Sequence, residues 1–341
     1  MQLPKKSGIA LRCQGNPSNL LDCTHSAERV GFDSLWLVEV AEADVLALAG
    51  AISEVTSEIK IATGVVNSNL RLPTLLAMGC ATLSELSNGR FALGVGAGDA
   101  PMSYTVEIPE NTALTRLRET LEIVHLCLSS KNVEYRGKLF EVKEFKLGFK
   151  LQNKVPIFGA AMGTKMVKIV VEVADGVLLM MPTPDYMKRI KQTIDSVTSE
   201  RLTKKSPSVA CHLVTSVSES RAEAEETAKR AVVSYIKVPV YRNSFVRMGF
   251  GNEISALELE SNKQRPNVKL WERVPTGMAE KLIVYGTPEE CVQKINTFVS
   301  QGVEYPIIYP CMTRSGFPDN VNDTIRLLAP FLEPREGSGT K

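Results

Sequence analysis

The sequence predicts an α/β fold, a single (β/α)8 TIM barrel with insertions. The first observation is a recurring sequence pattern in which a helical segment ends at a glycine and an apolar strand follows. It occurs as VGFDSLWLV (30–38), SNGRFALGV (87–95), VADGVLLMM (173–181) and QGVEYPIIY (301–309). The second observation is the number of apolar strands, because eight are expected, near residues 9, 35, 60, 92, 156, 177, 211 and 306. Eight βα units are the number that such a barrel needs.

The individual elements follow from periodicity. Continuous apolar runs such as residues 34–38 are typical of parallel strands that are buried on both faces. The first helical pattern starts at Pro17 and ends at Gly31, a residue type that often ends a helix. Helical spacing of apolar residues also predicts helices at 114–128, 166–173, 220–236 and 287–301. The last of these follows Thr287 and has Pro288 at its first position, which is a helix start signal.

We expect one barrel domain over residues 1–336, with two insertions and a disordered tail at 337–341. Residues 129–154 alternate in a way that is typical of a β-hairpin. Residues 237–280 are charged and irregular, and an insertion of that length in a compact barrel is usually a lid or a packing arm.

Composition excludes several classes of function. A net charge of +2 gives no basic face for nucleic acid. Seven cysteines without a C-x-x-C pair argue against a disulfide framework and a structural zinc site, and favour a reducing compartment. No apolar run is long enough for a signal peptide or a membrane span. We therefore expect a cytoplasmic protein with a small-molecule substrate, no bound metal, and no nucleic-acid or membrane partner.

The stretch ELSNGRFALGVGAGD (85–99) carries three glycines after a strand. A dinucleotide site would need G-x-G-x-x-G early in the domain, but here the spacing is G-x-G-x-G, an acid follows, and three strands come first. The sequence therefore favours glycines that leave room at the barrel mouth, where barrel active sites lie. The alternative is that the glycines only relieve crowding within the barrel, because glycine in a strand also marks bulges.

SNGRFALGVGAGD (87–99) resembles the signature of the bacterial-luciferase-like monooxygenase superfamily. The longer string 69–99 looks like one branch, the coenzyme F420-dependent methylenetetrahydromethanopterin reductases. The segments 156–179, 229–250 and 284–308 are similar to other parts of that branch. The resemblance implies a luciferase-like barrel and a homodimer or homotetramer. It also implies a deazaflavin-dependent oxidoreductase of EC class 1.5 that acts on a methylenetetrahydromethanopterin-type one-carbon carrier.

The resemblance also implies where the coenzyme binds. A bulge with a cis Gly64–Val65 peptide is expected behind the deazaflavin ring, in the segment that continues with Val66 and Asn67. Gly96 and Gly98 are expected beside the ring. The coenzyme's phosphate is expected on a loop that precedes a helix, because free N–H groups and the helix dipole attract an anion there. That loop consists of Gly159, Ala160, Ala161, Met162 and Gly163. An ordinary strand end and an ordinary tight turn are the alternatives for the two segments.

The chain departs from the reductase pattern at two places. Glu39-Val40 stands where the branch carries Asp-His, and Arg12, Cys13 and Gln14 stand where it carries an early acid. Glu39 and Asp99 are the expected catalytic residues, as carboxylates at the barrel mouth that touch the ring edge or a substrate nitrogen. A half-buried carboxylate there can have a raised pKa and donate a proton. The alternative for both is a structural carboxylate.

The three histidines, at 25, 125 and 212, are scattered and are expected to be structural. Two other functions stay open at this point. One is a reduced-FMN-dependent monooxygenase on the same fold, with FMN in place of coenzyme F420. The other is a non-catalytic flavin-binding homologue, which the missing histidine at position 40 and the missing early acid favour.

Overall fold

A computed structural model describes residues 1–40, 42–98, 112–129, 131–200, 206–262, 269–313 and 315–333. Eight of the described strands form a closed parallel barrel, because β10 pairs with both β9 and β12, and β12 pairs with β1. This confirms the predicted TIM barrel. Around the barrel the strands are β1 (Gly8–Arg12), β2 (Ser34–Val38), β3 (Lys60–Thr63), β5 (Phe91–Gly96), β8 (Ile157–Ala160), β9 (Gly176–Met180), β10 (Ser208–Val217) and β12 (Tyr305–Pro310).

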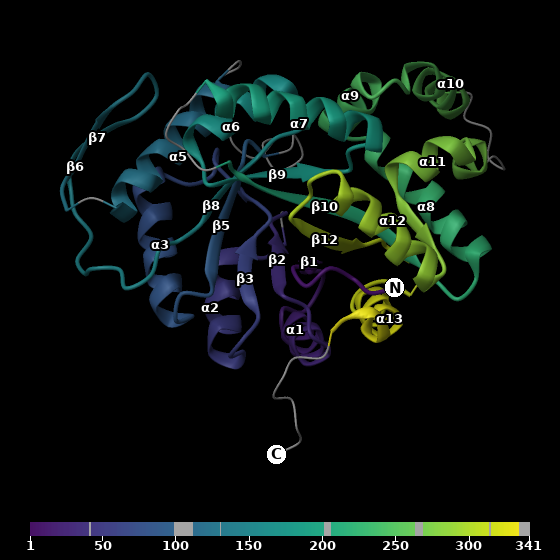
Figure 1. The fold of residues 1–341 in the computed structure, drawn as a ribbon, viewed down its shortest axis with the longest axis horizontal. Helices are drawn as coiled ribbons and strands as arrows, with labels where there is room; N and C mark the ends of the chain where they lie inside the picture. Colours follow the sequence, from purple (N-terminus) through teal and green to yellow (C-terminus); the bar gives the residue numbers. More distant parts are fainter. Residues whose placement is uncertain are drawn as a thin grey trace.

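Helices surround the barrel on the outside (Figure 1). They include α1 (Ser18–Val30), α2 (Val45–Val55), α3 (Pro73–Leu86), α5 (Ala113–Ser129), α6 (Thr164–Val173), α7 (Pro184–Ser199), α8 (Arg221–Ile236), α12 (Pro288–Ser300) and α13 (Asp319–Leu328). The predicted terminal signals are confirmed at two helices. Gly31 ends α1 in the left-handed conformation, with φ of 101°. Thr287 forms a capping box with Glu290 at the start of α12.

The two predicted insertions differ in outcome. The hairpin is confirmed as β6 (Val133–Arg136) paired antiparallel with β7 (Glu141–Phe145), and it projects from one side of the barrel (Figure 1). The expectation of an irregular segment at 237–280 is wrong. Its described part is mostly helical, with α9 (Pro239–Arg247), α10 (Gly251–Asn262), the 3₁₀ turn η1 (Leu270–Arg273) and α11 (Thr276–Leu282).

This helical insertion is held by a core of its own. Phe245, Phe250 and Leu257 from the insertion are buried, and they pack with Ala228 and Val232 of α8. Each helix contributes only a few apolar residues to this core. Because charged residues lie between them, no helical spacing of apolar residues could be recognised in the sequence. The division into one barrel domain with a tail at 337–341 stays a prediction, because the tail lies outside the described residues.

Side chains inside the barrel form layers, because alternate residues of each strand point inward. The lower layer contains two aromatic residues and five aliphatic ones, namely Ala10, Trp36, Ala62, Phe158, Leu178, Ala210 and Ile307. Two residues further along each strand comes an upper layer, which faces the carboxyl-terminal mouth of the barrel. Its members are Arg12, Val38, Gly64, Ala160, Met180, His212 and Tyr309.

Candidate functional site

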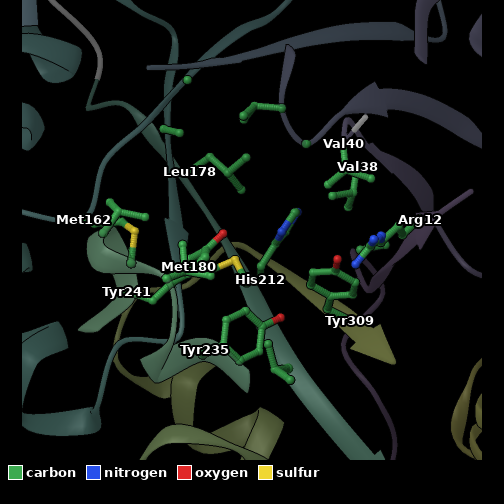
Figure 2. Close-up of a pocket in the computed structure, with 18 of the residues that line it drawn as sticks. Arg12, Val38, Val40, Met162, Leu178, Met180, His212, Tyr235, Tyr241 and Tyr309 are labelled. Carbon is green, nitrogen blue, oxygen red and sulfur yellow. The ribbon is translucent and has the colours of Figure 1, made fainter. Parts of the chain in front are cut away.

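A cavity of about 560 Å³ lies at the carboxyl ends of the barrel strands, and the upper layer forms its floor. Residues of α8 and α9 cover one side, among them Tyr235 and Tyr241, whose rings meet edge to face with centroids 4.9 Å apart. Figure 2 shows His212 pointing into the middle of the cavity, with Tyr309 between it and Arg12. The place and the size suit a ligand of cofactor or substrate size.

The floor of the cavity has two chemically different sides. On the adjacent strands β10, β12 and β1 it carries His212, Tyr309 and Arg12, which we call the polar arc. On the opposite strands β3, β5 and β8 it has Gly64 just after β3, Gly96 and Ala160, which we call the small-residue arc. A flat ligand therefore has free space on one side and hydrogen-bonding groups on the other.

The small-residue arc is built around a turn after β3. The peptide bond between Gly64 and Val65 is cis, as the resemblance implied. Both residues line the cavity, together with Asn67, Gly96 and Gly98. Val66 does not line it, because its side chain is fully buried in the core.

The glycines of β5 make room for this turn. A Cβ on Gly94 would overlap the carbonyl oxygen of Thr63, and one on Gly96 would lie 2.7 Å from Cγ2 of Val65. A Cβ on Gly98 would overlap the side chain of Asn67, and Gly98 also has φ of +75°. The glycines thus let the turn after β3 pack closely against β5. This agrees with the alternative in which they relieve crowding within the barrel, and they shape the cavity only indirectly.

Glu39 lies at the end of β2, lines the cavity and has a side chain that is only 3% exposed. Both carboxylate oxygens are held by the Arg71 guanidinium, at 2.6 Å each. One oxygen also accepts a hydrogen bond of 3.0 Å from the backbone N–H of Asn67. No sequence pattern pointed to Arg71 as the partner of Glu39. The hydrogen bond from Asn67 ties Glu39 to the turn after β3. Asp99, the second expected catalytic residue, lies outside the described residues.

The expected phosphate loop connects β8 to α6. Ala160, Ala161, Met162 and Gly163 line the cavity. Gly159 does not, because a Cβ there would lie 2.6 Å from Val170 of α6, so this glycine lets helix and strand pack closely. Gly163 is the N-cap of α6 and offers no side-chain acceptor to the first helical N–H groups.

Arg247 of α9 lies beside this loop. Its Nη2 donates a hydrogen bond of 3.5 Å to the carbonyl oxygen of Met162. Within the described ranges no carboxylate forms an ion pair with Arg247. The insertion therefore brings an additional positive charge to the start of α6, where the helix dipole is also positive.

The other two arginines at the cavity are already paired. Arg12 donates from Nη2 and Nε to the carboxylate of Glu42, at 2.6 and 3.2 Å. Burial lowers the pKa of Arg12, but the hydrogen bond and the charge of Glu42 act together with nearby tyrosines to raise it, and the net shift is upward. Arg230 of α8 donates to Glu226 at 2.7 and 2.9 Å. The polar side of the cavity thus has little net positive charge.

His212 was expected to be structural, but the fold brings it to the centre of the cavity. It is 2% exposed, and no described residue forms a hydrogen bond with its Nε2. Burial lowers its pKa to about 3, so the imidazole is neutral. The sequence did hold a signal, because His212 follows the inward-facing Ala210 by two residues. His25 and His125 lie on exposed helix faces.

The described parts of the chain hold no group of three or more His, Cys, Asp or Glu side chains that is placed to bind a metal ion. All seven cysteines are buried and none forms a disulfide. Among the described helices, none has both the length and the apolar character to cross a membrane.

Comparison with known proteins agrees with this architecture. The chain is 29% identical to the 5,10-methylenetetrahydromethanopterin reductase of Archaeoglobus fulgidus over 283 residues. The alignment covers 81% of this chain and 85% of that one. It is 33% identical over 177 residues to the F420-dependent glucose-6-phosphate dehydrogenase of Amycolatopsis mediterranei, covering 48% of this chain and 53% of that one. The structure of the coenzyme F420-dependent tetrahydromethanopterin reductase from Methanopyrus kandleri superposes with a TM-score of 0.79 at 22% identity, covering 97% and 99% of the two chains.

The family model for luciferase-like monooxygenases matches residues 2–305. That range contains all but the last residues of the barrel and every described segment that forms the small-residue arc. With its closed barrel and the cis turn beside the glycine strand, the chain belongs to the luciferase-like monooxygenase family.

Proposed function

We propose that the protein is a coenzyme F420-dependent oxidoreductase that transfers a hydride to or from a methylenetetrahydromethanopterin-type one-carbon carrier. The observation that carries the proposal is the division of one cavity into a small-residue arc and a polar arc. Two flat molecules can then lie face to face, which is what hydride transfer requires of the protein. The relatives whose names include coenzyme F420 support the same cofactor here.

The residues present fit the coenzyme. Nδ2 of Asn67 is buried beside the small-residue arc and has no hydrogen-bond partner in the described chain, so it can donate to a polar ring edge. Gly64, Val65, Gly96 and Gly98 would border the ring. When bound, the reduced deazaflavin supplies the hydride, and the protein supplies orientation and exclusion of water.

The loop before α6 would hold the phosphate of the coenzyme. Ala160, Ala161, Met162 and Gly163 face the cavity there, and Gly159 supports them from behind. Arg247 adds a charge that is free to pair with an anion, in a place where helix N–H groups also point.

The charges near the polar arc favour the one-carbon carrier over a sugar phosphate. Arg12 and Arg230 are each paired with a glutamate, and Arg247 lies at the coenzyme's end of the cavity. A phosphate close to the reacting carbon would therefore find no unpaired cation at the polar arc among the described residues. Tyr235, Tyr241 and Tyr309 instead offer flat faces and hydroxyl groups to an aromatic ring system. This reasoning supports an EC class 1.5 reaction, on a carbon–nitrogen bond.

Glu39 and Asp99 remain the proposed catalytic carboxylates. The bidentate contact with Arg71 and the hydrogen bond from Asn67 hold the Glu39 carboxylate against the turn after β3, where it can interact with positive charge on a substrate nitrogen.

The test is a titration of the apoprotein with reduced coenzyme F420 and, separately, with reduced FMN, followed by absorbance. We expect F420 to bind, and the bound form to reduce the methylene carrier without oxygen. Binding of FMN alone, with oxygen-dependent turnover, would identify a monooxygenase. Binding of F420 without turnover on any carrier would identify a non-catalytic homologue.

We also propose that the protein is a homodimer. Leu72, at the N-cap of α3, and Leu75, Met78 and Leu86 within it are exposed at helical spacing, and Leu72 and Leu75 are more than half exposed. An exposed apolar stripe of this kind is typical of a protein–protein contact. A homotetramer is the alternative, and the mass in solution separates the two.

A further inference from the structure

His212 occupies the centre of the cavity floor because it lies at an inward-facing position of β10. In β10, Ala210 belongs to the lower layer of the barrel interior, and His212 is the next inward-facing residue. The neighbouring inward residues are Met180 on β9 and Tyr309 on β12. His212 is therefore set into a rigid strand, and its ring points at whatever fills the cavity (Figure 2).

The surroundings of the ring provide packing but no hydrogen bond to Nε2. Trp36 and Tyr309 meet the imidazole edge to face, with ring centroids 6.2 and 5.7 Å away. On a third side lies Gly64, where an added Cβ would be only 2.8 Å from Nε2. A neutral imidazole has one donor and one acceptor, and buried polar groups of this kind are nearly always satisfied. The protein thus holds the ring firmly and leaves Nε2 without a partner.

We propose that His212 is a substrate-binding residue, whose Nε2 forms a hydrogen bond with an uncharged polar group on the ring system of a heterocyclic substrate. The inference rests on the proposed function in one respect, namely that the reactive ring of the coenzyme lies over the small-residue arc. Substrate then lies over the polar arc, and His212 orients it toward that ring.

The chemistry of the substrate group follows from what surrounds His212. A neutral imidazole pairs with a carbonyl oxygen, a ring nitrogen or a ring N–H, depending on its tautomer. A charged group would be disfavoured, because Arg12 on the same arc is paired with Glu42 and the other walls include Val38, Leu178 and Met180. His212 thereby selects a neutral polar edge, and a fixed hydrogen bond aligns the reacting carbon.

Nitrogen NMR of the full chain labelled with 15N-histidine tests this directly. The chain has three histidines, and His25 and His125 lie on exposed helix faces away from the cavity, so only His212 should respond to a ligand there. The probes are oxidised coenzyme F420 and tetrahydromethanopterin, alone and together. We expect the His212 Nε2 resonance to shift on addition of tetrahydromethanopterin, while those of His25 and His125 stay in place.

Two variants supply an affinity readout. His212→Phe keeps the ring volume without a polar atom, and His212→Gln places an amide near the position of Nε2. We expect the first to weaken tetrahydromethanopterin binding about tenfold, the effect of one buried hydrogen bond, with F420 affinity unchanged. The second should recover part of the loss. His125→Gln, on the exposed face of α5, is the matched control and should change neither affinity.

The outcomes separate this inference from the proposed function. If F420 binds but neither the His212 resonance nor the variants respond to tetrahydromethanopterin, the role of His212 is refuted and the proposed function stands. If F420 does not bind the wild-type protein, the proposed function fails, whatever His212 does. The NMR measurement uses the wild-type chain, so it remains decisive even if a variant fails to fold.

Discussion

The polar side chains at the barrel mouth differ mainly in whether other residues of the protein form hydrogen bonds or ion pairs with them. Glu39 is saturated by Arg71 and the Asn67 amide, and Arg12 is paired with Glu42. His212 Nε2 and Asn67 Nδ2 have no partner in the described chain. Saturated groups hold the site in shape, and unsatisfied buried groups are the ones available to a ligand. We therefore assign ligand binding to the second kind, whereas groups of the first kind hold the site in shape, Glu39 in addition to its proposed catalytic role.

Acid sensitivity of the fold should depend on His212. Burial lowers its pKa to about 3 in the native state, whereas the unfolded value is near 6.5. Between these values the unfolded chain binds more protons, so stability falls as the pH drops below 6.5. The cost is about 2 kcal/mol at pH 5. In urea denaturation, the free energy of unfolding should fall less between pH 7 and pH 5 in His212→Phe than in the wild type. An equal loss in both proteins would mean that His212 is not held neutral.

Glu39→Gln tests the proposed role of this carboxylate. Gln keeps the shape but loses the charge, so F420 affinity should persist and the rate of hydride transfer should fall on the order of a hundredfold. Stopped-flow absorbance of the coenzyme measures the rate. Glu54→Gln, at an exposed position of α2 outside the cavity lining, is the control and should retain the rate. A wild-type rate in Glu39→Gln would restrict Glu39 to positioning.

Because Gly94 lies so close to Thr63, one added methyl group at Gly94 should lower the stability of the protein strongly. In Gly94→Ala the new Cβ would overlap the backbone oxygen of Thr63, which cannot move without disturbing β3. The free energy of unfolding should fall by about 3 kcal/mol. Gly277→Ala is the control, because Gly277 lies in α11 with no atom within 4 Å of the added Cβ. It should raise stability by up to about 1 kcal/mol. Equal effects of the two changes in denaturation would contradict the packing argument.

Among the elements, α9 has the clearest functional consequence. It begins with Pro239 at its first position and is anchored by the buried Phe245, which places Arg247 beside the start of α6. The insertion that we expected to be irregular is thus an ordered support for the end of the cavity where we propose that the phosphate binds.

Arg247→Ala should weaken binding of coenzyme F420 by about tenfold, because one charge-assisted contact with an anion is lost. A deazaflavin that ends before the phosphate should bind the variant and the wild type equally well, and fluorescence titration measures both. Arg242→Ala is a control on the same helix, since Arg242 pairs with Glu258 instead. If the two ligands lose affinity equally, Arg247 does not contact the phosphate.

At the scale of the whole molecule, the cavity and the proposed contact between subunits lie on different elements. The cavity opens at the carboxyl ends of the strands, whereas the apolar stripe of Leu72, Leu75, Met78 and Leu86 lies along α3 on the outside of the barrel (Figure 1). Assembly and activity should therefore be separable.

Leu75→Asp should convert the dimer into a monomer, because a charge would be buried in an apolar contact. Light scattering coupled to size-exclusion chromatography gives the mass. Leu259→Asp, at an exposed position of α10, is the control and should leave the mass unchanged. A wild-type protein that is monomeric would contradict the proposed dimer from the outset.

The sequence by itself determined the barrel and most of its elements. Strands such as residues 34–38 are apolar on both faces, and helix ends such as Gly31 are local signals, so both can be recognised without knowing the partners. The cis turn at Gly64 was implied by the resemblance, and the loop at 160–163 by its small residues before a helix.

Only the tertiary structure decided which side chains meet. The contact of Arg71 with Glu39, the room that Gly94 leaves for Thr63, and the unpartnered His212 all join segments that are about 30 residues or more apart. Such contacts depend on strand register and on the closure of the barrel, which no local pattern encodes. The physical reason is that a hydrogen bond or an overlap is set within a few tenths of an ångström, whereas periodicity specifies only which face a residue occupies.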